Sequence, residues 1–231
     1  MNLTEVLLES RLVAIVRGIS REAAVTAGQG MTRGGIRLME VTLNTPGAHD
    51  IIADWRERHE GKAYVGAGTV LNVQMAKEAV AAGAQFLVSP NVDLSVIEYA
   101  VEHGVEIWPG AMTPTEIVAA HEAGARVVKL FPMASLGIPY LREIKAPLNH
   151  IPLLATGGAT LENIADYYAA GAAAVGLGSA LLPREALVAG DHEQIAACAQ
   201  RFVEAAEILG SAPVSDEEYV YLGIYMRVPS A

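Results

Sequence analysis

The sequence predicts an α/β protein that folds as a single (β/α)8 barrel of the TIM type. Short, β-prone apolar runs recur roughly 20 to 26 residues apart, and a helical pattern follows each of them. Regular alternation of this kind is typical of a parallel sheet covered by helices. Eight such units within 231 residues favour a closed barrel over an open doubly wound sheet, because barrels of this size are common as one domain.

The composition excludes several other classes of protein. With 52 % hydrophobic and 18 % charged residues, the chain is too apolar to be disordered, and it is long enough to bury a core without disulfides. Its one cysteine, Cys198, excludes a disulfide framework and a cysteine-rich zinc site. The net charge of −10 argues against broad binding to nucleic acid or to an anionic membrane. A small anionic partner needs only a local cluster of positive charge.

Neither the N-terminus nor any apolar run is typical of secretion or membrane insertion. Glu5 and Glu9 interrupt the first apolar pattern, whereas a secretory signal has a basic start and an unbroken apolar run. The longest uncharged run, 167–183, contains three glycines and is shorter than the roughly 20 residues of a membrane helix. We therefore expect a soluble, cytoplasmic protein.

The elements follow one another in a simple order. The first is a helix over 3–10, which we expect to cap the bottom of the barrel. Glycines near the ends of later helices supply left-handed C-terminal caps, as in EAGA at 122–125 and AAGA at 169–172. We expect the barrel domain to span residues 1–209. Its eight strands are expected at 12–17, 37–43, 63–70, 86–89, 105–109, 126–131, 151–155 and 173–178.

The pattern changes after residue 209. Residues 210–213 are typical of a linker, and 219–228 (YVYLGIYMRV) form an apolar, β-prone run. A closed barrel offers no free sheet edge, so such a run either packs over its own subunit or reaches a neighbouring one. The alternative is an end without fixed structure. We assign residues 210–231 to a C-terminal extension and expect it to serve assembly rather than chemistry.

Three charged residues lie at the C-terminal ends of predicted strands, where barrel enzymes carry their active sites. Lys129 and Glu40 lie inside apolar strands, where a permanent charge is costly, and Arg17 ends the first strand. Burial lowers the pKa of a lysine and yields a neutral amine, which attacks carbonyl carbons. A carboxyl group beside it can move protons, and a guanidinium suits carboxylate or phosphate.

Each of these charges also has a structural interpretation. The head of Lys129 could extend out of the strand end into solvent. Glu40 could form a structural ion pair with Lys129 or Arg17, and Arg17 could serve only to clamp Glu40. We favour the functional interpretation because all three residues lie on strand ends that meet at one end of the barrel.

Two glycine loops follow the last two predicted strands. Gly157 and Gly158 precede one helix, and Gly178 and Ser179 precede another helical segment. Backbone N–H groups after strands 7 and 8 form the common phosphate site of barrels, and glycine lets the backbone approach the anion closely. The pair of loops therefore predicts a phosphate ester as ligand.

The histidines show no metal-ligand spacing, and we expect them at the surface on helices and loops, away from the strand ends. We therefore predict that the protein uses no metal. They are His49, His59, His103, His121, His150 and His192.

The motifs at the strand ends resemble those of the 2-keto-3-deoxy-6-phosphogluconate aldolase family, which also includes 4-hydroxy-2-oxoglutarate and 2-keto-3-deoxy-6-phosphogalactonate aldolases. The resemblance covers roughly residues 3–209 and seven of the eight strand ends, in order. The matching motifs are EVTLNTP at 40–46, GAGTVL at 66–71, SPN at 89–91, PGAMTPTE at 109–116, KLFP at 129–132, TGG at 156–158 and GLGSAL at 176–181.

The resemblance implies a homotrimeric class I aldolase that uses no metal and no cofactor. In it, Lys129 matches the lysine that forms the Schiff base, and Glu40 matches the general acid/base. The other implied site residues fall into two groups. The substrate-binding group is Arg17, Asn44, Gly66, Thr69, Pro90 and Phe131, and the phosphate-binding group is Gly157, Gly158, Gly178 and Ser179.

The implied reaction cleaves a small anionic 2-keto acid. A 2-keto-3-deoxy-6-phospho sugar acid would give pyruvate and glyceraldehyde 3-phosphate, an Entner–Doudoroff step, and 4-hydroxy-2-oxoglutarate would give pyruvate and glyoxylate. Some gluconate-type members carry arginine at the place of Asn44, whereas LNTP is closer to galactonate-type members. The sugar epimer therefore stays open.

Two other functions are compatible with the same residues. A phosphate-binding barrel isomerase or epimerase would use the glycine loops without needing Lys129. A non-catalytic barrel would simply bind an anionic metabolite. A covalent adduct between Lys129 and pyruvate separates the aldolase from both.

Overall fold

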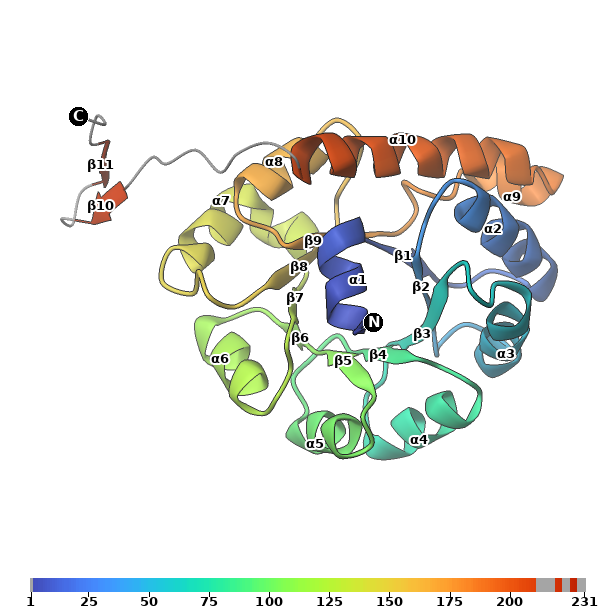
Figure 1. Cartoon of the computed structure of the whole chain (residues 1–231), viewed down its shortest axis with the longest axis horizontal. Helices are drawn as coiled ribbons and strands as arrows, with labels where there is room; N and C mark the ends of the chain where they lie inside the picture. Colours follow the sequence, from blue (N-terminus) through green and yellow to red (C-terminus); the bar gives the residue numbers. More distant parts are fainter. Residues whose placement is uncertain (1, 211–218, 222–224, 228–231) are drawn as a thin grey trace.

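Strands and helices alternate around a ring in the computed structural model, which describes residues 2–210, 219–221 and 225–227 (Figure 1). Within these residues the parallel sheet has nine strands, in the spatial order β5-β4-β3-β2-β1-β9-β8-β7-β6. Every predicted strand range overlaps one of them, which confirms the predicted barrel. The strands are β1 (Leu12–Val16), β2 (Leu38–Thr42), β3 (Tyr64–Gly68), β4 (Phe86–Val88), β5 (Glu106–Trp108), β6 (Gly110–Ala111), β7 (Val128–Leu130), β8 (Leu153–Thr156) and β9 (Ala174–Leu177).

The additional strand arises from a break in the fifth predicted strand. Only Pro109 separates β5, which pairs with β4, from β6, which pairs with β7. The two pieces together close the ring, so the barrel has eight strand positions. The break occurs because proline has no N–H for the ladder, although the Pro109 carbonyl still accepts a hydrogen bond from the Lys129 N–H at 2.9 Å.

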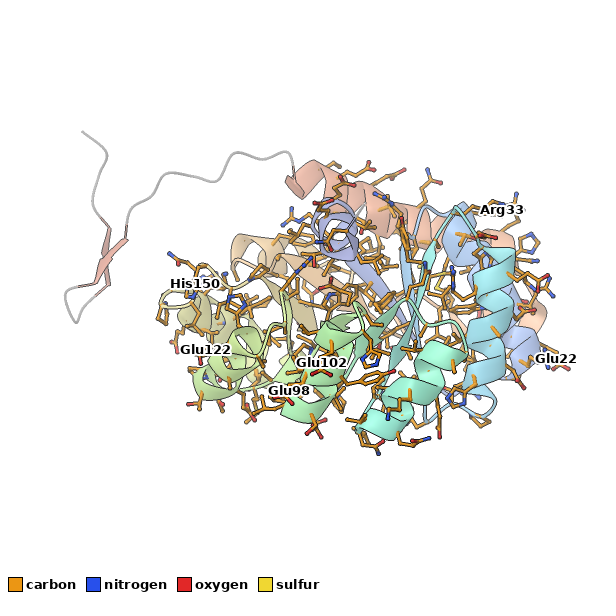
Figure 2. The ribbon with its side chains drawn as sticks, turned by 60° about the horizontal axis from the view of Figure 1, so that its bottom comes forward. Glu22, Arg33, Glu98, Glu102, Glu122 and His150 are labelled. Atoms are coloured by element: carbon orange, nitrogen blue, oxygen red, sulfur yellow. The ribbon has the colours of Figure 1, made fainter. Side chains whose placement is uncertain are left out.

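Apart from the first helix, which lies over one end of the ring, the helices form its outer layer (Figure 1). Their outward faces carry charged residues such as Glu22, Glu98 and Glu102, which are exposed (Figure 2). No helix within the described part of the chain is long and apolar enough to cross a membrane. The helices are α1 (Leu3–Ser10), α2 (Arg21–Arg33), α3 (Ala48–Arg58), α4 (Val73–Ala81), α5 (Leu94–Glu102), α6 (Pro114–Glu122), α7 (Met133–Lys145), α8 (Ile164–Ala169), α9 (Arg184–Ala189) and α10 (His192–Gly210).

Helix α1 covers one end of the barrel, as predicted (Figure 1). Asn2 begins the helix with a capping box, which satisfies backbone donors at its N-terminus. Val6 and Leu7 are fully buried in a cluster inside the barrel. The Thr4 hydroxyl donates to the Glu106 carboxylate at 2.8 Å, which ties the helix to β5.

The side chains that point into the barrel change from apolar to polar along three of the strands. Because side chains alternate between the two faces of a strand, Val13 shares a face with Arg17, Leu38 with Glu40, and Val127 with Lys129. The first members of these pairs belong to the apolar cluster beneath α1. An apolar plug therefore fills the bottom of the barrel and leaves the polar residues at the opposite end. The plug also contains Phe86 and Trp108, whose ring centroids are 4.5 Å apart.

His59 corrects the expectation that the histidines lie at the surface. It is only 4 % exposed, and its Nδ1 lies 3.4 Å from the Thr32 hydroxyl. Gly28 leaves room for its ring, since a Cβ there would lie 2.7 Å from the His59 Nε2. Sequence spacing alone did not reveal this contact between α2 and the end of α3.

Two short antiparallel strands lie beyond the barrel sequence. They are β10 (Tyr219–Tyr221) and β11 (Tyr225–Arg227), which pair with each other as a separate sheet. The apolar pattern at 219–228 predicts one extended run, whereas the structure pairs its two ends as antiparallel strands. The predicted linker at 210–213 lies almost wholly outside the described residues.

Candidate active site

Lys129 lies in the middle of β7, between β6 and β8, and faces the interior of the barrel. Its backbone is in register with Gly110 on one side and Leu154 on the other. The residue is 5 % exposed, and its Nζ lies 5.1 Å from the centroid of the Phe131 ring. Burial lowers the pKa of Lys129, and the positive charge of Arg17 lowers it further, while the nearby Glu40 raises it. The net lowering favours the neutral, nucleophilic amine.

Glu40 lies in β2 and is 1 % exposed. Burial raises the pKa of its carboxyl group, against the opposing effects of the Lys129 and Arg17 charges. Its Oε2 has no hydrogen-bond partner, and no ion pair among the described residues includes Glu40. The structural ion pair considered from the sequence is therefore not formed among the described residues.

Two glycines of β3 leave room for neighbouring side chains: Gly68 for Glu40, and Gly66 for Phe86 of the apolar plug. A Cβ at Gly68 would lie 2.5 Å from the Glu40 Oε1. A Cβ at Gly66 would lie 2.3 Å from the ring of Phe86. Both positions face the interior, so any larger residue would displace the carboxyl group or the plug. Gly66 therefore has a packing role whether or not it binds substrate.

Arg17 and Thr69, which follow β1 and β3, are joined by a side-chain hydrogen bond. Arg17 is exposed, and its Nη2 donates to the Thr69 hydroxyl at 3.4 Å. Thr69 has a φ of 61°, a left-handed conformation that is strained for a β-branched residue. Backbone strain of this kind is concentrated at functional sites, which supports the assignment of Thr69 to the substrate site.

A pocket of about 400 Å³ opens at this end of the barrel. It brings together residues from the ends of β1, β7, β8 and β9, including seven predicted from the sequence. Those seven are Arg17, Lys129, Phe131, Gly157, Gly158, Gly178 and Ser179. The amine and the glycine loops thus line one cavity, as a phosphorylated carbonyl substrate requires.

Other predicted residues do not line this pocket. Asn44 is exposed in the loop after β2, and Pro90 lies after β4, beside Gly110. A Cβ at Gly110 would lie 2.4 Å from the Pro90 carbonyl carbon. The roles of Asn44 and Pro90 in substrate binding therefore stay predictions.

The structure adds pocket residues that the sequence analysis did not select. Most have small or apolar side chains, which carry no chemical signature in a sequence. Thr156 and Thr160 could have been found, because Thr156 begins the TGG motif and Thr160 follows that motif by two residues. The added lining residues are Ile15, Thr156, Ala159, Thr160, Gly176 and Ala180.

Thr45 is a further residue that only the structure identifies. It is 3 % exposed, and its hydroxyl accepts a hydrogen bond from the Gly18 N–H at 2.9 Å. The hydroxyl of Thr42 lies 3.1 Å away. Thr45 thereby fixes the loop that follows β1, directly after Arg17.

The described residues contain no group of three or more His, Cys, Asp or Glu side chains that could hold a metal ion. The pocket itself offers the Lys129 amine, the Arg17 guanidinium and the backbone of the glycine loops, and Glu40 lies near enough to Lys129 and Arg17 for their charges to interact.

Comparison with known proteins agrees with this geometry. Residues 3–198 match the family model described as KDPG and KHG aldolase, where KDPG is 2-keto-3-deoxy-6-phosphogluconate. The chain is 38 % identical to the 2-dehydro-3-deoxy-phosphogluconate aldolase of Treponema pallidum, over 87 % of this chain and 95 % of that protein. It is 36 % identical to the 2-dehydro-3-deoxy-6-phosphogalactonate aldolase of Escherichia coli, over 85 % of this chain and 96 % of that protein.

A solved structure shares the architecture of the barrel. It is KDPG aldolase from Legionella pneumophila with pyruvate captured as a covalent carbinolamine intermediate. The two structures superpose with a TM-score of 0.78 at 27 % identity, over 84 % of this chain and 95 % of that one. From the family model and these relatives, the chain belongs to the KDPG and KHG aldolase family.

Proposed function

We propose that this protein is a class I aldolase that forms a Schiff base through Lys129 and cleaves a 2-keto-3-deoxy-6-phospho sugar acid to pyruvate and glyceraldehyde 3-phosphate. The observation that carries the proposal is the buried amine of Lys129, with its lowered pKa, in the same pocket as two glycine loops. A phosphate-binding isomerase or epimerase would use the glycine loops without needing this amine. Cleavage of 4-hydroxy-2-oxoglutarate to pyruvate and glyoxylate is a second activity open to the same site.

The first half of the reaction joins substrate to Lys129. The neutral amine attacks the C2 carbonyl carbon and gives a carbinolamine. Loss of the C2 oxygen as water then leaves an iminium ion, which accepts electrons from the neighbouring carbons. We assign to Glu40 the supply and removal of the protons in these steps, directly or through one water, because burial raises the pKa of its carboxyl group and a carboxyl group beside the reactive amine can act as general acid/base.

The second half breaks the C3–C4 bond. Glu40 takes the proton of the C4 hydroxyl, the C4 oxygen becomes the aldehyde oxygen, and the bond electrons pass to C3 and the iminium nitrogen as an enamine. Protonation at C3 and attack of water at C2 release pyruvate and regenerate the amine. Arg17 neutralises the substrate's carboxylate or phosphate charge, and the glycine-loop amides bind the phosphate.

Trapping with pyruvate tests this function directly. Incubation with pyruvate followed by borohydride reduction should add the mass of one reduced pyruvyl group to the protein. Peptide mapping should place the group on Lys129, because burial lowers the pKa of this amine and favours its neutral, nucleophilic form inside the pocket. The same treatment without pyruvate is the control. Full retention of the unmodified mass would contradict the Schiff-base mechanism and favour an isomerase or a non-catalytic anion-binding barrel.

We place this reaction in the cytoplasm, within the Entner–Doudoroff type of carbohydrate metabolism, because the proposed substrates are phosphorylated and cannot cross a membrane unaided. LNTP at 43–46 is closer to galactonate-type members of the family. Comparing kcat/KM for the gluconate and galactonate epimers decides between them.

We further propose a homotrimer in which residues 1–209 form the barrel and residues 210–231 serve assembly. Three exposed apolar side chains support an interface at the active-site end: Leu71, Leu94 and Met112 are 45, 51 and 45 % exposed. They follow β3, β4 and β6, which lie close together in the ring. Contiguous exposed apolar patches are typical of protein–protein interfaces.

Truncation after Gly210 tests the assembly role of the extension. The shortened chain should form the pyruvate adduct normally, because none of the described residues beyond 180 lines the pocket. Sedimentation should show a weaker oligomer than for the full chain at the same concentration. An unchanged oligomer with unchanged thermal stability would show that the extension is dispensable.

A further inference from the structure

Two carbonyl groups of the loop after β8 accept hydrogen bonds from side chains. The Tyr167 hydroxyl donates to the Gly157 carbonyl at 2.9 Å, and the Asn163 Nδ2 donates to the Gly158 carbonyl at 2.9 Å. Tyr167 lies in α8 and Asn163 immediately precedes it. Neither residue lines the pocket, whereas both glycines do. The two side chains therefore bind the loop on the side that faces away from the pocket.

Holding a carbonyl also fixes the direction of the next amide. In a trans peptide unit, which is planar, the C=O and the following N–H point in opposite directions. The N–H groups that follow the two held carbonyls belong to Gly158 and Ala159. In the part of the chain that the structure describes, neither donates a hydrogen bond to a protein acceptor. These two donors are therefore available to an anion in the pocket.

The loop needs this support because its backbone is unusual. Gly157 and Gly158 have φ values of 108° and 77°, a region in which glycine moves freely and which has no single strong minimum. Asn163 also accepts a hydrogen bond from the Thr160 N–H at 2.8 Å, so one side chain spans the loop. Tyr167 is 3 % exposed, and burial raises the pKa of its phenol, which keeps the proton that it donates.

We infer that Tyr167 and Asn163 are positioning residues that aim the Gly158 and Ala159 amides at the phosphate group of the substrate. They touch neither the substrate nor the reacting atoms. They act by preventing the two peptide units from rotating. Such a rotation would turn the carbonyl oxygens towards the anion, and these oxygens would repel it. The inference rests on the proposed function for the identity of the anion, but it concerns binding and not the Schiff base.

The adjacent tyrosine supplies a matched control. Tyr168 is also buried, and its hydroxyl donates to a backbone carbonyl, that of Arg11, at 3.0 Å. That contact lies at the start of β1, at the end of the barrel opposite to the pocket. Tyr167→Phe and Tyr168→Phe therefore remove the same atom and the same kind of hydrogen bond, and only the first removal affects the loop.

The test compares two substrates and one probe that needs no catalysis. In Tyr167→Phe we expect KM for the phosphorylated sugar acid to rise about 2–10-fold, the factor that one neutral hydrogen bond supplies, with kcat little changed. KM for 4-hydroxy-2-oxoglutarate, which has no phosphate, should stay the same. The Kd of inorganic phosphate, measured by calorimetry, should rise by the same factor as the first KM. Asn163→Ala should repeat this pattern, and Tyr168→Phe should change none of the three values.

Other results overturn the inference. If Tyr167→Phe and Tyr168→Phe change the three values equally, Tyr167 has only a general structural role. If both substrates lose affinity equally in Tyr167→Phe, the loop does not act on the phosphate. If the unaltered protein forms the pyruvate adduct but does not bind inorganic phosphate, the positioning role fails while the aldolase function stands. Absence of the adduct would instead contradict the proposed function.

Discussion

Replacing Lys129 by methionine should abolish both turnover and the pyruvate adduct. Methionine has a similar length and is apolar, so it fits the buried position on β7 without leaving a cavity. It offers no electron pair to the C2 carbonyl, so no iminium can form. We expect loss of most of the roughly 10⁶-fold or larger acceleration that enzymes supply, measured as release of pyruvate and as the mass of the borohydride-treated protein.

Lys145→Met is the matched control for this substitution. Lys145 is a second lysine whose pKa is lowered by burial, but it donates to the backbone carbonyls of Asn149 and Ile151, each at 2.9 Å. Its loss should lower thermal stability and leave turnover and adduct formation intact. If Lys129→Met retained turnover while Lys145→Met lost it, the assignment of the Schiff-base lysine would be wrong.

Lys129→Met should raise the thermal stability of the protein, whereas Lys145→Met should lower it. Because its pKa is lowered in the folded state, the unfolded chain binds this proton more tightly, and Lys129 therefore destabilises the fold at neutral pH. Lys129→Met should raise Tm. The gain should be full at pH values below the lowered pKa and should shrink as the pH rises towards 10.5, the ordinary value for lysine. A gain that does not vary with pH would contradict this explanation.

Glu40→Gln should lower kcat by about 10²–10⁴-fold, the usual contribution of a general acid/base. Glutamine has the shape of glutamate and fits the space left by Gly68, but it cannot exchange a proton. The pyruvate adduct should still form, more slowly, since the Lys129 amine is present. The measurements are steady-state kcat and the rate of adduct formation.

The pH dependence of adduct formation gives a second expectation for Glu40→Gln. The carboxylate of Glu40 raises the pKa of Lys129, so its removal should lower that pKa further. The neutral amine then persists to lower pH, and the acid limb of adduct formation should move to lower pH than in the unaltered protein. A shift to higher pH, or none, would show that the two charges do not interact.

Glu106→Gln is the matched control, because Glu106 also lies in a barrel strand but contacts Thr4 at the opposite end. It should leave kcat unchanged. Full activity in Glu40→Gln would show that the Glu40 carboxyl group is a packing element and not a proton carrier.

Much of the fold was predictable because it depends on local patterns. The apolar runs, the helical periodicity and the glycine caps are set by residues close in sequence. The break in the fifth strand at Pro109 was harder to predict. Its position depends on which neighbours β5 and β6 pair with, namely β4 on one side and β7 on the other.

The candidate catalytic residues could be selected from the sequence for a related reason. A lysine or glutamate inside an apolar strand stands out in a sequence, because burying a charge is costly and needs a purpose. Lys129 and Glu40 were found in this way. Thr45 and Tyr167 were not, because a threonine in a loop and a tyrosine in a helix are ordinary until their hydrogen-bond partners are known.

The sequence by itself predicted the barrel, the strand ends at which barrel enzymes carry their chemistry, and Lys129 and Glu40 as the candidate amine and carboxyl group there. Only the tertiary structure decided that Glu40 forms no ion pair with a described residue, that Gly68 makes room for it, and that Tyr167 holds the Gly157 carbonyl. The physical reason is distance along the chain. Strand periodicity and a charge within an apolar run can be recognised from residues close in sequence. In contrast, pKa shifts, steric room and hydrogen bonds depend on atoms that folding brings together from distant parts of the chain.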